Sequence, residues 1–237
     1  MADTTNITKV FCLGDGYAHG HIWPEWPQIL QALRPDLKVV VISAIGAGHE
    51  FLINELLNND VTNSVVIFQW PAHDRFDKLV QDSSWDSIIK SDVVYHFNTY
   101  NTHQGTWWCS SSSNTDIIQQ YHSRYIQDQQ SVIRQDTQKT LVESYMASHN
   151  ARYVATSNAD QEHFARTTNF SHLLIRELQP LPLLHYHWVV QSIMPAAGLQ
   201  VNTKIAQELL NRLSSHTWTQ YGPDNKEIWT KMSRIDL

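Results

Sequence analysis

The first seventy residues alternate short, uninterrupted apolar segments with amphipathic helical patterns. The apolar segments are 9–14 (KVFCLG), 38–46 (KVVVISAIG) and 64–70 (SVVIFQW). Between them, residues 24–33 and 49–57 repeat their apolar side chains at helical spacing. A strand that is apolar on both faces must be covered on both faces, as in a parallel sheet that lies between helices. We therefore expect an α/β fold built on a parallel sheet.

The chain length and a fourth apolar run define the expected domain organisation. A chain of 237 residues suits one α/β domain with an insertion. A fourth strand is predicted at residues 151–157 (ARYVATS). We expect a single domain over residues 1–237, with an insertion at about 76–150 and a C-terminal arm at about 214–237.

The insertion begins with a stretch of mixed character and continues as a helical pattern. Residues 76–114 show no clear period and end in a serine run, which predicts a surface loop that includes Cys109. Over residues 116–148 apolar side chains recur near helical spacing, which predicts one long helix or two. This apolar stripe consists of Ile118, Tyr121, Tyr125, Val132, Ile133, Leu141 and Tyr145.

The C-terminal part combines a last amphipathic helix with an aromatic tail. Residues 199–213 predict a helix whose apolar stripe is Val201, Ile205, Leu209 and Leu213. The tail contains Trp218, Tyr221 and Trp229, and we expect these rings to pack on the domain or on a partner. The nine tryptophans of the chain fit a Trp-rich core or a large interface.

Charge and hydropathy disfavour two classes of partner. The formal net charge is -6 and no block of Lys or Arg occurs, which disfavours nucleic acid. No apolar run has the length of a membrane span, and the first residues lack the apolar core of a signal peptide. Cys12 and Cys109 give no indication of a disulfide framework, which agrees with the cytoplasm.

A ligand site is expected at the carboxyl edge of the sheet. Open parallel sheets bind ligands beyond the carboxyl ends of their strands. The segments that follow the four predicted strands are 14–16, 46–49, 70–74 and 157–160. The segment around Met194 and Pro195 should return to this same edge. These stretches, distant in sequence, would then meet at one rim.

The residues at this rim resemble the motifs of the SGNH (GDSL-type) hydrolases. Gly14-Asp15-Gly16 is similar to the first block of that family, Gly-Asp-Ser. The string 46–49 (GAGH) is similar to the Gly-Ala-Ser-Asn string of a phage-associated branch, which also carries Gln-Trp and then Arg, here Gln69-Trp70 and Arg75. The stretch 194–198 (MPAAG) fits the frame of the last block.

The resemblance implies a fold and also the loss of its chemistry. It implies a three-layer α/β/α, flavodoxin-like SGNH-hydrolase-type fold with about five parallel strands. Gly16 stands at the nucleophile position and Met194 at the base position, and neither residue performs that role. The acid falls at Gln191 or Ser192, and the oxyanion asparagine at His49. Only backbone donors at Gly16 and Gly48 would remain.

The leading hypothesis is therefore a catalytically inactive SGNH-like domain that acts as a structural or interaction protein. By resemblance it is a component of a phage virion, cytoplasmic or virion-associated, that binds other virion proteins or itself. No catalytic residue, metal or cofactor is predicted. The expected vestigial pocket consists of Gly14, Asp15, Gly16, Gly48, His49, His73 and Met194.

Two other functions stay open at this point. The first is an active esterase with rearranged residues, in which Asp15, His49 or His73-Asp74 activates water. The second is a carbohydrate-binding module, in which Trp107-Trp108 stacks on sugars.

Two further groups of side chains have both a functional and a structural interpretation. His185 and His187 would share one face if they lay on a strand, as metal ligands do, although buried histidines with satisfied hydrogen bonds are the favoured interpretation. A nucleophilic Cys109 with His103 is disfavoured.

Overall fold

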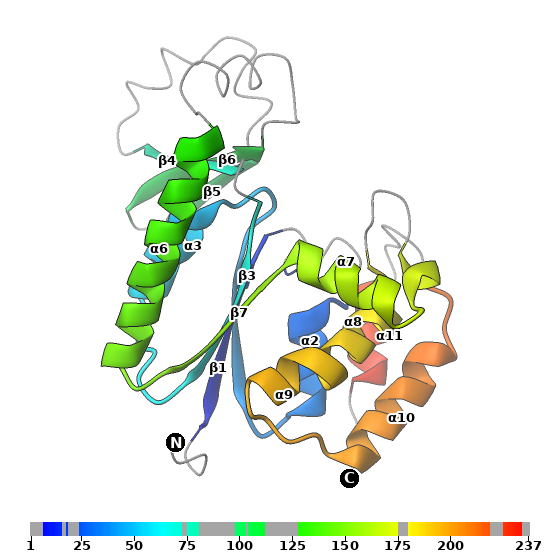
Figure 1. Ribbon diagram of the computed structural model, residues 1–237. Coiled ribbons are helices and arrows are strands. Elements are labelled where there is room, and N and C mark those ends of the chain that lie inside the picture. The colour runs from blue at the N-terminus through cyan, green and yellow to red at the C-terminus, as the bar shows by residue number, and fades with distance from the viewer. Residues whose placement is uncertain are drawn as a thin grey trace.

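The computed structural model describes residues 7–15, 18, 24–72, 75–80, 98–102, 104–111, 128–174, 180–218 and 225–233. Within these ranges, four parallel strands form the central sheet (Figure 1). They are β1 (Lys9–Gly14), β2 (Lys38–Ser43), β3 (Val65–Trp70) and β7 (Arg152–Ser157), in the order β2-β1-β3-β7. The predicted α/β fold with a parallel sheet is confirmed, with four strands among the described residues where about five were expected.

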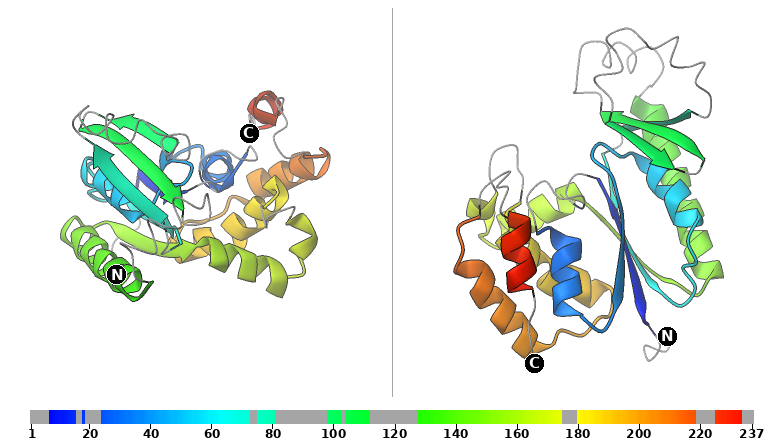
Figure 2. Two further views of the ribbon diagram at one scale, coloured as in Figure 1. Left: turned by 90° about the horizontal axis from the view of Figure 1, so that it is seen from above. Right: turned by 180° about the vertical axis from the view of Figure 1, so that it is seen from behind.

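Side chains that alternate along β1 enter two separate hydrophobic cores. Val10 and Cys12 pack into one core, while Phe11 and Leu13 pack into the other. The first core is closed by α2 (Trp26–Leu33), α8 (Pro182–Trp188) and α10 (Thr203–Ser214), among other elements. The second is closed by α3 (His49–Leu57) and α6 (Asp128–Ser148) (Figure 2). Helices therefore flank the sheet, as the uninterrupted apolar strands required.

The local sequence explains where helix α2 begins and which of its faces is buried. Glu25 is its N-cap and forms a capping box with Gln28, and Pro27, rather than Pro24, lies in the first turn. The predicted apolar face is confirmed, because Trp26, Ile29, Leu30 and Leu33 are all buried. At its end, Pro35 lies in a tight turn that leads into β2.

Strand β2 differs from its prediction as a buried strand. It is an edge strand of the sheet and ends at Ser43, before the predicted boundary. Val41 is 40% exposed, because an edge strand has a neighbour on one side only. Its apolar sequence shows that it belongs to a sheet, but it does not reveal its place in the strand order.

The insertion begins with a second sheet where a loop was predicted, and this is a correction. Strands β4 (Arg75–Val80), β5 (Asn98–Thr102) and β6 (Gly105–Ser111) form an antiparallel sheet in the order β4-β6-β5. The side chains of Trp107 and Cys109 on β6 are buried. The Trp107 ring packs edge-on against the Phe51 ring of α3, with the ring centroids 5.8 Å apart. These strands were missed because their sequences show neither an uninterrupted apolar run nor a clear alternation of apolar and polar residues.

Helix α6 has a different buried face from the one predicted. Val142 and Met146 are buried, whereas Val132, Ile133 and Leu141 are among the exposed large apolar side chains. The helix touches the rest of the protein through its contacts with β7 and α3, and these contacts select the buried face. The first part of the predicted stripe, at residues 118–125, lies outside the described residues.

The C-terminal arm packs back on the domain. Helix α7 (Asn158–Thr167) follows β7, and α8 continues through a π-helical segment, Val189–Ile193, into α9 (Met194–Ala196). Helix α10 begins at Thr203, so Val201 of the predicted stripe precedes it, while Ile205, Leu209 and Leu213 are buried as expected. Helix α11 (Asn225–Met232) follows. Trp218 and Trp229 are buried in the first core, so these rings do not form an exposed contact surface. Tyr221 lies outside the described residues.

Gly198 closes the turn after α9 and should not tolerate a side chain. Its φ is +62°, and a Cβ atom would collide with the Arg152 guanidinium. That guanidinium donates a hydrogen bond to the Ala197 carbonyl. We expect Gly198→Ala to lower the free energy of unfolding by about 1–2 kcal/mol, because an L-residue is strained in this region. Urea denaturation would measure this loss, with Ala196→Gly as the helix-end control, and an unchanged midpoint for Gly198→Ala would contradict the expectation.

Candidate functional site at the carboxyl edge of the sheet

An ion pair lies where β1, β4 and β7 come together at the carboxyl edge. Asp15 follows β1 and is 2% exposed. Arg75, the first residue of β4, donates from Nη2 to Asp15 Oδ2 at 3.1 Å. Asn158, directly after β7, donates from Nδ2 to Asp15 Oδ1 at 3.3 Å. Asp15 therefore braces three chain segments, and its charge is compensated by Arg75.

A second carboxylate lies at the N-terminus of α3. Asp77 of β4 accepts hydrogen bonds from the backbone N–H of Gly48 at 2.7 Å and of Phe51 at 2.9 Å. Asp77 is 5% exposed, and burial raises its pKa to about 6, against the opposing effect of these two hydrogen bonds. The Cys109 thiol, opposite it on β6, also hydrogen-bonds to Asp77. The Gly48 donor, expected to be free for an oxyanion, is therefore occupied.

His49 is held between a carbonyl and an amide. It is 2% exposed, and its Nε2 lies 3.1 Å from Pro71 O and 3.1 Å from Gln135 Nε2. Its ring lies against Trp70, with centroids 5.4 Å apart. Hydrogen bonds connect the imidazole to α6 and to the end of β3, so His49 joins two elements and does not face an open cleft.

A cavity of about 590 Å³ opens beside this cluster. Its walls come from the ends of β3 and β7 and from the facing turns of α6 and α7. Lys139 lies over the Trp70 ring at 5.7 Å, and the carboxylate of Asp160 accepts a hydrogen bond from Ser157 at 2.9 Å. Asn158 also lines the cavity, and its buried Oδ1 has no hydrogen-bond partner. The cavity therefore has the chemistry of a polar binding surface, without a free acid–base pair among the described residues.

Met194 does not join this site, which corrects the expectation that its segment returns to the carboxyl edge. Met194 is fully buried in the first hydrophobic core. Four residues later, Gly198 lies against Arg152, which begins β7, so this segment lies at the amino edge. The reason is the direction of α8 and α9, which run back along the sheet after α7 (Figure 1).

Of the expected vestigial pocket, the structure brings together Gly14, Asp15, Gly48 and His49 near the ends of β1 and β2. Gly16 and His73-Asp74 lie outside the described residues. Asn158 belongs to the segment 157–160 that was expected at this edge, but neither Asp77 nor Gln135 was predicted. Asp77 stands between Phe76 and Lys78, and nothing in this local sequence distinguishes it.

The remaining histidine and cysteine candidates are structural. His185 and His187 lie on α8, not on a strand, so two residues of separation place them on different faces. Burial lowers the pKa of His185 to about 3, and its Nδ1 lies 2.7 Å from Gln161 Nε2. Burial raises the pKa of the Cys109 thiol far above its ordinary value, which disfavours a nucleophilic thiolate. His103 lies outside the described residues.

Two further features are absent from the part of the chain that the structure describes. No group of three or more His, Cys, Asp or Glu side chains there has the arrangement of a metal site. Within the same ranges, no helix combines the length and apolar character that a membrane span requires.

The chain matches no protein-family model, no curated protein and no solved structure. The SGNH-like interpretation therefore stays a prediction based on the residues of this chain.

Proposed function

We propose that this chain is a catalytically inactive domain of SGNH-hydrolase-like, three-layer α/β/α architecture that serves as a structural or interaction protein. The observation that carries the proposal is the contact between Asp77 and the Gly48 N–H at 2.7 Å. In a hydrolase with this layout, that donor would stabilise a developing oxyanion. A carboxylate in its place repels such an anion, so the position opposes the chemistry that the resemblance would require.

The other polar groups of the site support the same conclusion. Asp15 is paired with Arg75 and is 2% exposed, so its carboxylate is not open to a substrate water. His49 lies within hydrogen-bond distance of a backbone carbonyl and an amide. A rearranged esterase would need one of these groups free to activate water, so the structure gives that alternative no support. The carbohydrate alternative is weakened too, because Trp107 is 5% exposed and offers no open face to a sugar.

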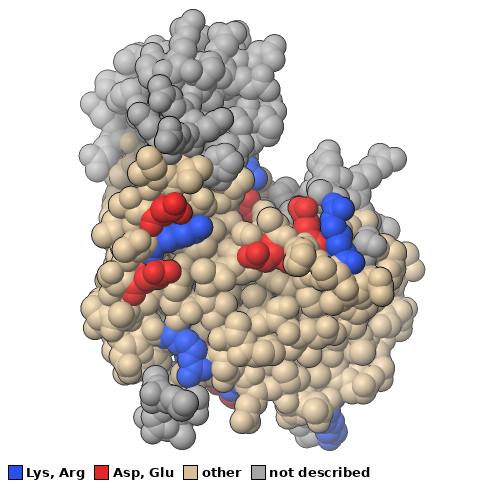
Figure 3. All heavy atoms as spheres, in the orientation of Figure 1, with Lys and Arg blue, Asp and Glu red and all other residues tan. Residues whose placement is uncertain are grey.

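An interaction role is supported by the outer surface of α6. Ile133 and Leu141 are 58% and 62% exposed, and eight residues of separation place them on the same side of the helix. Between them, Thr137 Oγ1 donates to the Ile133 carbonyl at 2.9 Å, so its hydroxyl is satisfied within the helix. On the face seen in Figure 3, charged side chains occur in small mixed groups separated by uncharged surface. A virion protein, as the resemblance suggests, would use such a surface for contacts with other proteins.

An esterase assay on the purified chain tests the proposal. We expect short-chain aryl esters and acetylated sugars to be hydrolysed no faster by the natural protein than by His49→Gln and Asp15→Asn variants. These two variants are the matched controls for adventitious hydrolysis, and circular dichroism would confirm that they are folded. Turnover by the natural protein that either folded variant abolishes would overturn the proposal and would establish the rearranged esterase instead.

A further inference from the structure

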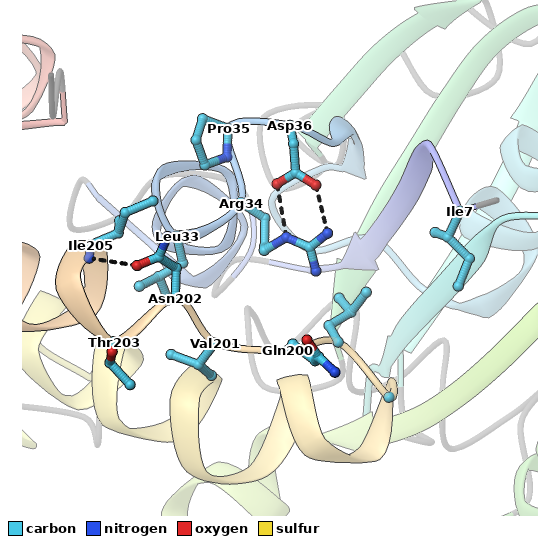
Figure 4. A pocket seen from close by; sticks show the side chains of 12 residues that line it. Ile7, Leu33, Arg34, Pro35, Asp36, Gln200, Val201, Asn202, Thr203 and Ile205 are labelled. Atoms are coloured by element: carbon cyan, nitrogen blue, oxygen red, sulfur yellow. Dashed lines mark hydrogen bonds and ion pairs between the residues drawn. The ribbon is translucent and has the colours of Figure 1, made fainter. Parts of the chain in front are cut away.

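A second cavity, of about 830 Å³, opens at the amino edge of the sheet, away from the site described above (Figure 4). Three separate segments form it: Ile7 before β1, the turn at residues 33–36, and residues 198–205 leading into α10. Its volume is in the range of cavities that bind small molecules. The vestigial pocket lies at the opposite edge, so this cavity is independent of the proposed function.

Arg34 places a guanidinium in this cavity with part of its donor set unused. Its Nε donates to Asp36 Oδ1 at 2.8 Å and its Nη2 to Asp36 Oδ2 at 2.6 Å. Both bonds use one edge of the planar group, and within the described part of the chain Nη1 has no hydrogen bond. The Arg34 side chain is 20% exposed and that of Asp36 is 59% exposed, so Asp36 lies on the outer side of the pair. The edge that contains Nη1 is left for a second acceptor.

The turn that carries this pair is held in place before any ligand arrives. Gln31 Nε2 donates to the Leu37 carbonyl at 2.9 Å, and its Oε1 accepts from Val39 N at 3.1 Å. Pro35 fixes the backbone between the two charged residues. The guanidinium is therefore preorganised, which reduces the entropy that a ligand must overcome on binding.

The rest of the cavity offers apolar side chains beside polar ones, among them Asn202 at the start of α10. Six of its lining residues have aliphatic or proline side chains: Ile7, Leu33, Pro35, Leu199, Val201 and Ile205. Gln200 and Thr203 add neutral polar groups. A ligand that fits this environment has one planar anionic group for the guanidinium edge and an apolar body for the walls.

We propose that this cavity binds a small monocarboxylate with an apolar body. The carboxylate accepts hydrogen bonds from the free edge of Arg34, and the body lies against Leu33, Leu199 and Val201. Asp36 holds the guanidinium in position, and its charge also weakens the attraction for a second carboxylate. Removal of Arg34 and removal of the Asp36 charge should therefore have opposite effects on affinity.

Isothermal titration calorimetry on the full chain tests this site with three probes. Hexanoate has both the carboxylate and an alkyl chain. Hexanamide has the same chain without the charge, and acetate has the carboxylate without the long chain. We expect one hexanoate to bind per chain, with each of the other two probes weaker by about tenfold or more. Equal affinity for hexanoate and hexanamide would overturn the proposal, and so would the absence of hexanoate binding.

Variants then assign the binding to this cavity. We expect Arg34→Met to weaken hexanoate by about tenfold or more, and Asp36→Asn to strengthen it by about threefold. Arg34→Lys keeps the charge but loses the planar fork, so its affinity should fall between those of Arg34→Met and the natural protein. Thermal unfolding of each variant without ligand separates a loss of binding from a loss of folding. Unchanged hexanoate binding in folded Arg34→Met would place the site elsewhere and overturn the proposal.

Discussion

Replacing Arg75 by methionine should lower the free energy of unfolding by about 3 kcal/mol. The replacement leaves the Asp15 carboxylate, which is 2% exposed, without the guanidinium that lies 3.1 Å from it. A buried charge that loses its counter-ion costs more than the pair contributed, because the ion has already been removed from water. The hydrogen bond from Asn158 remains, but a neutral amide does not replace the cation. Urea denaturation at neutral pH measures the loss.

A double variant distinguishes the effect of the unpaired Asp15 charge from that of the lost Arg75 side-chain packing. In Asp15→Asn/Arg75→Met the unpaired charge is absent, so we expect most of the lost stability to return, while Asp15→Asn alone should show a smaller loss than Arg75→Met. If Arg75→Met and the double variant are equally stable, the ion pair does not hold β1, β4 and β7 together.

The central elements of the fold were predictable because their signals are local. Strands β1 and β3 are buried on both faces, so their residues are apolar throughout. Helix α2 is buried on one face only, so its apolar residues form a single stripe. The burial of α6 was not predictable in the same way. Leu141 and Val142 are neighbours and both are apolar, and only the contacts with β7 and α3 decide that Val142 is buried. A helical period identifies the element but does not identify its partner.

The candidate site was predictable where it follows a central strand. Asp15, Gly48 and His49 were identified because residues after parallel strands meet at one edge. Met194 was misplaced because the order of motifs along the chain does not specify to which edge α8 and α9 return. Asp77 was missed because its importance comes from a contact 29 residues away, with Gly48. A strand in a separate small sheet supplies this contact, and no local pattern encodes it.

Replacing that carboxylate, in Asp77→Ala, should lower the free energy of unfolding by about 3 kcal/mol at neutral pH. The Gly48 and Phe51 N–H groups lose their common acceptor at the N-terminus of α3, and buried donors without a partner are costly. The contact between the inserted sheet and α3 loses its polar connection at the same time. Denaturation with two probes, Trp fluorescence and far-UV circular dichroism, would show whether the two sheets still unfold together.

The pH dependence of the free energy of unfolding gives a second, independent test of the buried Asp77 carboxylate. Burial raises its pKa from 3.8 to about 6, so the folded protein binds this proton more tightly than the unfolded chain does. Stability should therefore rise as the pH falls from 7 to 5, by about 1 kcal/mol from this group, and the gain should level off near pH 4. Asp77→Asn removes the titrating group but keeps a similar shape, so its stability should lack this increment. The same slope in both proteins would show that the pKa of Asp77 is not raised in the folded protein. A steeper slope in the natural protein would show that the effect of burial on this carboxylate outweighs that of its two backbone hydrogen bonds.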